Sequence, residues 1–321
     1  MSANTFSFLI TSIEKDNLIN NKEIKFLKST NPYVEYFLVY KNCKITIFKT
    51  QKCLVQGQES DVLTVMQEHF PNHLSKTNSS LPFDYDKQNF HQNIIGSDEV
   101  GVGDYFGGLC VCAVFLTPET AKQAKTLGVK DSKLLNEQQI ISIAKKLIDL
   151  VPYRISNLWP NQYNELMYSY KNAHVIKTVC HHYVIVKLCD DLQQKNLSVN
   201  QVVIDQFASE KKFHEYLSTA YTHNKISYPI TFCTHAETKY LAVACASIIA
   251  RYYFLEQIKT LSSQAGQPLP LGAWNDKIKL AATTLIQTCG NDSNKINELL
   301  NNYVKMHFSN TKKLIDEEHN N

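Results

Sequence analysis

Four acidic side chains stand where a strand or a helix is expected to begin or end, and such positions suit catalytic or metal-binding carboxylates. Asp98 and Glu99 are adjacent and close a short apolar run. Asp205 ends a β-branched run that starts at Val202, and Glu237 precedes a long apolar stretch. In α/β proteins the backbone at a strand end is rigid and its side chains reach a crevice. These four acids are therefore the first candidates for an active site.

The Asp98-Glu99 pair has two explanations that the residues alone leave open. Neighbouring side chains on a strand point to opposite faces, so both acids can reach one metal only if the strand ends or bends there. Gly101 and Gly103 permit such a bend and would let a ligand approach the main chain. The alternative is a hairpin whose acidic turn is simply solvated.

The other two acids also have structural alternatives. Asp205 could cap a helix that starts near Ser209, although three residues intervene, which weakens that explanation. Glu237 near a helix N-terminus would be favoured by the helix dipole with or without a metal.

The segments around these acids predict alternating strands and helices. Residues Ile94 to Leu116 read as strand, turn and strand, because an apolar run follows the glycines. We expect the later elements to be a helix from Asn136 to Leu150, a strand from Val151 to Leu158, a helix-rich region to Asn196, strands at 202–205 and 230–233, and a helix from about Thr238 to Leu261.

Two short segments suit contacts with a phosphate backbone. Gly101-Val102-Gly103 could present main-chain groups to a substrate, and Lys130, Ser132 and Lys133 bring two ammonium groups and a hydroxyl into one loop. Such contacts position a nucleic-acid strand without reading its sequence.

The N-terminal region forms a pattern of its own. Three β-rich runs at 33–40, 44–48 and 52–57 predict a small antiparallel sheet, with a helix on either side. Lysines interleaved with aromatic residues could lie along a nucleic acid, although a solvated outer face explains them too. The lysines are Lys41, Lys44, Lys49 and Lys52. Residues 75–92 turn polar and read as a linker.

Composition limits the class of protein. The 321 residues are 44% apolar, enough for about two domains, and a net charge of +3 does not by itself indicate nucleic-acid binding. Nine cysteines without metal-site spacing suggest reduced thiols, and we see neither a signal peptide nor an apolar run of membrane length. We expect a cytoplasmic monomer.

His174, His181 and His182 on one predicted helix lack a suitably spaced carboxylate, so we favour polar contacts over a metal site.

Several motifs resemble ribonuclease HIII, a bacterial relative of ribonuclease HII that cuts RNA paired to DNA. The strongest is S-D-E-V-G-V-G-D-Y-F-G-G at 97–108, and others are K-D-S-K at 130–133, V-I-D-Q-F at 203–207, L-A-V-A-C-A-S-I-I-A-R at 241–251 and K-M-H-F-S-N-T-K-K at 305–313. Two departures are Gly108, where the family usually has proline, and the bulky Trp274-Asn275 turn.

The resemblance implies an α/β fold in which a ribonuclease H-like mixed five-stranded sheet, flanked by helices, occupies residues 93–321. A substrate-gripping α+β domain similar to the TATA-binding-protein fold would occupy residues 1–74. The implied site is Asp98, Glu99, Asp205 and Glu237 around two Mg²⁺ or Mn²⁺ ions, because hard cations suit carboxylate oxygens and offset their repulsion. The main chain of Gly101 to Gly103 would contact ribose 2′-hydroxyls.

The implied reaction is hydrolysis of the RNA strand of an RNA/DNA hybrid, leaving 5′-phosphate and 3′-hydroxyl ends. Two alternatives remain. One is cleavage at a single ribonucleotide in DNA, as by ribonuclease HII, although Val102 replaces the arginine of the G-R-G motif of that enzyme. The other is a module that binds hybrids without cutting them.

Overall fold

The structure is a computed structural model that describes residues 3–29, 31–74, 92–130, 132–220, 226, 228–290 and 292–319. The chain divides into two compact units, Met1–Phe83 and Asp84–Asn321. They are called here the N-terminal unit and the larger unit. The predicted linker at 75–92 lies outside the described residues except for Gln92.

The N-terminal unit is a small α+β domain, as expected. Its antiparallel sheet has the strand order β1-β5-β4-β3-β2. The strands are β1 (Ala3–Leu9), β2 (Lys25–Leu27), β3 (Val34–Tyr40), β4 (Cys43–Phe48) and β5 (Lys52–Gln58), and the helices are α1 (Ser12–Ile19), α2 (Glu59–His69) and α3 (Pro71–Leu74). The sequence predicted the three central strands but neither β1 nor β2.

Alternation along the central strands gives this sheet one buried and one open face. Cys43, Ile45 and Ile47 of β4 are buried in a core shared with α2. The intervening Lys44 and Thr46 therefore project from the opposite face. That face carries a mixture of apolar and basic side chains, because Lys52 shares it on the neighbouring strand.

The larger unit is built on a mixed five-stranded sheet with the order β10-β9-β6-β7-β8. The hairpin of β6 (Ile94–Val100) and β7 (Leu109–Leu116) is antiparallel, and β8 (Tyr153–Leu158) continues it. On the other side β9 (Gln201–Asp205) runs parallel to β6, and β10 (Ile230–Cys233) runs parallel to β9. This arrangement confirms the predicted ribonuclease H-like sheet.

Two long helices pack against this sheet. α9 (Leu241–Ala265) lies so close to β6 that a Cβ on Gly96 would stand 2.3 Å from the backbone carbon of Ala242. α7 (Ala173–Gln194) packs with the alternate β6 and β7 side chains, such as Ile95, so it covers the opposite face. α9 is long and apolar enough to cross a membrane, but 72% of its most apolar window is buried in the fold.

One predicted boundary was wrong. The helix expected from about Thr238 begins at Leu241, and Glu237 lies in a separate short turn, η3 (Ala236–Thr238). The helix dipole of α9 therefore does not explain the position of Glu237.

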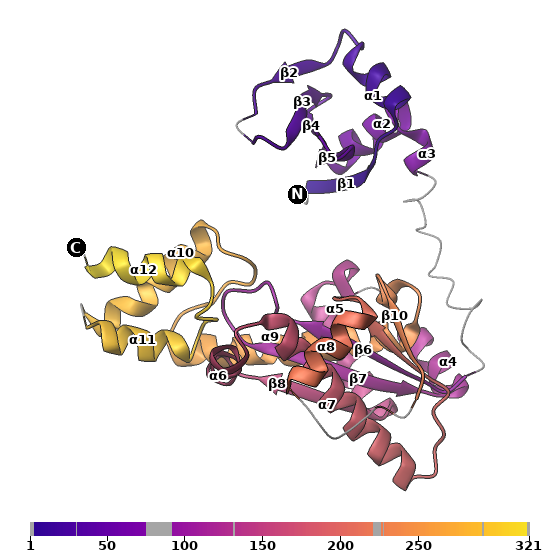
Figure 1. Cartoon of the computed structure of the whole chain (residues 1–321), viewed down its shortest axis with the longest axis vertical. Helices are drawn as coiled ribbons and strands as arrows, with labels where there is room; N and C mark the ends of the chain where they lie inside the picture. The colour runs from indigo at the N-terminus through magenta and orange to yellow at the C-terminus, as the bar shows by residue number, and fades with distance from the viewer. Residues whose placement is uncertain are drawn as a thin grey trace. The chain divides into compact units, whose positions relative to one another are not determined.

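The remaining helices complete the larger unit, and Figure 1 shows the last three gathered at one end of it. The remaining helices and short 3₁₀ turns of this unit are α4 (Pro118–Thr126), η2 (Ser132–Leu134), α5 (Glu137–Leu150), α6 (Pro160–Tyr170), α8 (Glu210–Ala220), α10 (Asp276–Ile286), η4 (Gln287–Cys289), α11 (Ser293–Asn301) and α12 (Ser309–His319).

The two departures from the family pattern are both accommodated. Gly108 N–H donates to Gln257 Oε1 at 2.7 Å, and the Trp274 ring packs edge-on against Tyr105.

Candidate active site

Asp98 and Glu99 lie within a paired strand, not at its end. Asp98 is opposite Cys112 and Glu99 opposite Val111 in the β6–β7 ladder, which continues to Val100. The bend follows at Gly101, whose φ is +104°. The two acids therefore lean toward opposite faces of the sheet, Asp98 toward α9 and Glu99 toward α7, and the bend that the glycines permit comes only after Val100.

Three of the four acids nevertheless line one pocket of about 430 Å³. Asp98 and Glu99 reach it from β6, and Asp205 reaches it from the end of β9, as predicted. The loop after β6, the turn η2, the start of α5 and one side of α9 complete the wall. These contribute Gly101, Val102, Gly103, Asp104, Ser132, Lys133, Glu137, Ile140, Ser247 and Arg251.

The environment of the pocket raises the pKa values of Asp98 and Asp205. Burial and the nearby Glu99 carboxylate raise the pKa of Asp98 well above its usual range, although Ser247 and the Glu99 N–H donate hydrogen bonds to it. Burial also raises the pKa of Asp205, and repulsion from Glu237 and Glu99 adds to this. The Ala236 N–H donates to Asp205 Oδ1 at 2.7 Å and fixes that side chain. A cation would relieve the repulsion between these carboxylates.

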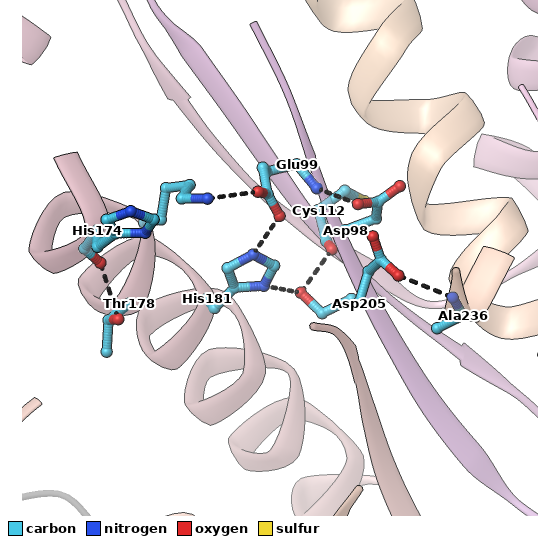
Figure 2. Close-up of polar contacts among 10 residues, drawn as sticks. Asp98, Glu99, Cys112, His174, Thr178, His181, Asp205 and Ala236 are labelled. Atoms are coloured by element: carbon cyan, nitrogen blue, oxygen red, sulfur yellow. Dashed lines mark hydrogen bonds and ion pairs between the residues drawn. The ribbon is translucent and has the colours of Figure 1, made fainter. Parts of the chain in front are cut away.

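Glu99 is held from α7 by both of its carboxylate oxygens. Lys177 Nζ lies 3.1 Å from Oε1 and His181 Nε2 lies 2.9 Å from Oε2 (Figure 2). Burial would raise the pKa of Glu99, but the contacts with His181 and Lys177 outweigh it and lower the pKa. The second ring nitrogen of His181 is 2.7 Å from Ser97 Oγ, which itself lies 2.9 Å from the Cys112 carbonyl oxygen. This chain of hydrogen bonds fixes the plane of the imidazole ring.

Glu237 is buried beside the pocket and pairs with a lysine. Lys133 Nζ donates to Glu237 Oε1 at 2.6 Å, and this contact lowers the pKa of Glu237 although burial alone would raise it. Glu237 does not line the pocket, but its charge acts on Asp205. The loop that contains Lys133 is also tied to α9, because Ser132 Oγ lies 2.9 Å from Ser247 Oγ.

The donor set fits a hard divalent cation, which prefers carboxylate oxygens. Within the described part of the chain, no three acidic, histidine or cysteine side chains converge on one point. The contacts above explain this, because Lys177 and His181 hold Glu99 toward α7 while Lys133 holds Glu237. Of the four acids, Asp98 and Asp205 are the two with no hydrogen bond to a lysine or histidine side chain in the described part of the chain.

The other predicted contact residues are distributed unevenly. Gly101, Val102, Gly103, Ser132 and Lys133 line the pocket, whereas Lys130 is half-buried and does not. In the N-terminal unit, Lys44 and Lys52 are exposed on the open face of the sheet and Lys49 is exposed in a turn. Lys41 instead pairs with Glu68 of α2.

Sequence reasoning missed four site residues, namely Ser97, Lys177, Ser247 and Arg251. Ser97 adjoins the acid pair, and its alternation with Glu99 could have placed both on one face. Lys177 and His181 are four residues apart and so share one side of α7, as do Ser247 and Arg251 on α9. The histidine was correctly assigned to polar contacts, but nothing in the sequence named Glu99 as its partner.

Comparisons with known proteins agree with this architecture. The family model described as Ribonuclease HII matches residues 95–311. A Ribonuclease HIII of Lactococcus lactis is 37% identical over 89% of this chain and 90% of its own length, and one of Streptococcus pneumoniae is 35% identical over 96% and 97%. The crystal structure of Bst-RNase HIII in complex with Mn²⁺ is 28% identical, covers 99% of this chain and 100% of that chain, and gives a TM-score of 0.66.

A more distant structure extends the likeness in fold. Aquifex aeolicus RNase H3 is 24% identical over 94% of this chain, with a TM-score of 0.51. Because the family model spans most of the larger unit and the curated relatives span both units, the chain belongs to the ribonuclease HII family and, within it, groups with ribonuclease HIII.

Proposed function

We propose that this chain is a metal-dependent endoribonuclease that hydrolyses the RNA strand of RNA/DNA hybrids. The observation that carries the proposal is the single pocket onto which Asp98, Glu99 and Asp205 open, beside the loop of Gly101 to Gly103. Membership of the family supports the reaction, and the Mn²⁺ complex of Bst-RNase HIII supports the use of a divalent cation.

Asp98, Glu99, Asp205 and Glu237 would hold two Mg²⁺ or Mn²⁺ ions. We assign Asp98 and Glu237 mainly to the side of the attacking water, and Glu99 and Asp205 to the side of the leaving oxygen or to a position shared by both ions. Held by these carboxylates, such ions would supply the charge that activates a water, positions the scissile phosphate and offsets charge on the leaving oxygen, and the expected products carry 5′-phosphate and 3′-hydroxyl ends. Burial and repulsion between carboxylates raise the pKa values of Asp98 and Asp205, and a nearby cation would offset that repulsion.

The walls of the pocket provide the contacts that select RNA. The main chain of Gly101 to Gly103 would meet ribose 2′-hydroxyls, which distinguish RNA from DNA. Ser132, Lys133 and Arg251 surround the same pocket and would hold the phosphates on either side of the cleaved bond. Lys130, outside the pocket, would contact a phosphate further along the strand.

The N-terminal unit would increase affinity by gripping the duplex. Lys44 and Lys52 on the open face of its sheet, with Lys49 in the adjoining turn, would contact phosphates. Lys41 is a weaker candidate because Glu68 pairs with it.

Cleavage at a single ribonucleotide in DNA is the second candidate function. Val102, a partly buried apolar residue of the pocket, cannot make the charged contacts of the arginine in the ribonuclease HII motif. We therefore expect hybrids to be the better substrate.

The test is cleavage of a labelled RNA/DNA hybrid in EDTA, Mg²⁺ or Mn²⁺ by the wild type and by Asp205→Asn. Asparagine keeps the size of the side chain and its acceptor for the Ala236 N–H but removes the charge. We expect cation-dependent cutting by the wild type and a loss of at least about 10³-fold in the variant. If the wild type binds the hybrid but does not cut it in either cation, the remaining interpretation is a module that binds hybrids without cutting them.

A further inference from the structure

The Glu99 carboxylate is held by a cluster of buried groups that the proposed reaction does not use. The Lys177 and His181 side chains are 8% and 0% exposed, respectively, and each contacts a different oxygen of Glu99. The Phe207 ring completes the cluster, with Lys177 Nζ 4.2 Å from its centroid and the His181 ring stacked on it at 5.3 Å. Phe207 lies two residues after Asp205 in the chain. The cluster therefore connects α7 to Glu99 and to the segment that follows Asp205.

Lys177 acts on Glu99 as a cation. Its ammonium lies 3.1 Å from Oε1 at a site largely excluded from water, where charges interact more strongly than at the surface. A divalent ion bound through the same oxygen would stand a few ångströms from this ammonium and would be repelled by it. The ion and Lys177 therefore compete for one carboxylate.

His181 differs from Lys177 in this respect, because it approaches the other oxygen and is held in place by Ser97. It can keep its bond to Oε2 while the ammonium leaves Oε1. The long lysine side chain has the freedom to withdraw, and the Phe207 face offers the ammonium a second favourable contact.

We propose that Lys177 is a positioning residue that holds Glu99 toward α7 and exchanges with the divalent cation for Oε1 of that carboxylate. This inference rests on the proposed metal-dependent function. The exchange lowers the affinity for the cation bound through Glu99, and it keeps the buried carboxylate neutralised whenever that cation departs.

The test measures Mn²⁺ binding in the absence of substrate, using the electron paramagnetic resonance signal of the unbound ion as the readout. Lys177→Met removes the ammonium and retains much of the apolar stem, so we expect Mn²⁺ to bind about tenfold more tightly at the affected site. Lys177→Gln, which restores a polar group without charge, should behave in the same way and serves if the methionine variant folds poorly.

Two controls separate this effect from a change in net charge or in the fold. Lys187→Met removes one charge from an exposed position of the same helix, so its Mn²⁺ affinity should stay within about twofold of the wild type. In a Glu99→Gln background, Lys177→Met should no longer change the affinity, because the contested carboxylate is gone.

Equal or weaker Mn²⁺ binding by both Lys177 variants would overturn the exchange while leaving the proposed function intact. An undiminished effect of Lys177→Met in the Glu99→Gln background would also overturn it, since the lysine would then act elsewhere. Absence of Mn²⁺ binding by the wild type would overturn the exchange and the proposed function together.

Discussion

Lys305 offers the sharpest test of the packing around the active-site loop. It is fully buried, and its ammonium donates to the carbonyl oxygens of Asp104 at 2.6 Å and Gly107 at 2.8 Å. It therefore ties the C-terminal segment to the loop that follows Gly103. Burial lowers the pKa of Lys305 from 10.5 to about 7, although the Asp104 charge opposes this.

The sign of the pH dependence follows from that lowered pKa. Below pH 7 the lysine is charged in both the folded and the unfolded chain, so the full cost of burying its charge opposes folding. Between pH 7 and 10.5 the unfolded chain binds a proton that the folded chain does not, so stability rises with pH. Since Lys305 is half-titrated at pH 7 when folded, raising the pH from 7 to 9 should contribute about 2 kcal/mol of stability.

Lys305→Met should abolish this contribution. We expect the difference in unfolding free energy between wild type and variant to change by about 2 kcal/mol from pH 7 to pH 9, in favour of the wild type. Unfolding in urea, monitored by tryptophan fluorescence, reports on the larger unit because Trp159 and Trp274 both lie there. Lys312→Met removes an exposed lysine nearby and is the matched control. Parallel pH profiles for wild type and Lys305→Met would refute the burial of this ammonium.

Three further predictions address the fold, the pocket and the N-terminal unit. Gly96→Ala should destabilise the protein by about 3 kcal/mol because its Cβ would meet the α9 backbone at 2.3 Å, whereas Gly103→Ala, with nothing within 4 Å, should leave the melting temperature unchanged. Asp98→Asn should raise the melting temperature in EDTA at pH 8, and the gain should shrink toward pH 4, because the raised pKa means that ionisation of Asp98 opposes folding. Replacing Lys44 and Lys52 together by alanine should weaken hybrid binding and reduce the slope of its salt dependence by about 2.

For each of these predictions, one result would contradict the reasoning behind it. A Gly96→Ala protein as stable as the Gly103→Ala protein would mean that β6 and α9 are not in close contact. An Asp98→Asn protein less stable than the wild type at pH 8 would mean that the carboxylate is stabilised in the pocket. An unchanged salt slope would place the duplex elsewhere on the N-terminal unit.

Much of the fold was predictable because its elements carry strong local patterns. The β6–β7 hairpin follows from the apolar runs around Gly101 and Gly103, and α5 begins at the residue after its Asn136 cap. β2 was missed because its three residues are all exposed and so carry no alternation. β1 was missed although polar and apolar residues alternate from Thr5 to Phe8. Its pairing with β5 is set by the tertiary fold.

The convergence of Asp98, Glu99 and Asp205 on one pocket was predictable, but the orientations of these side chains were not. Alternation already required Asp98 and Glu99 to face opposite sides of a continuous strand, yet the sequence could not show that pairing continues to Val100. The partner that turns Glu99 toward α7, His181, is 82 residues away. Such a long-range pair leaves no periodic signal, and only the packing of α7 on the sheet brings it together.

The most direct test of the proposed function compares two labelled duplexes of equal length, an RNA/DNA hybrid and a DNA duplex with a single ribonucleotide, at equal enzyme and cation concentrations. The account predicts that the wild type cuts the hybrid much faster and leaves 5′-phosphate ends, and that Asp205→Asn cuts neither duplex. Equal or faster cutting at the single ribonucleotide, or cutting that persists in Asp205→Asn, would contradict it.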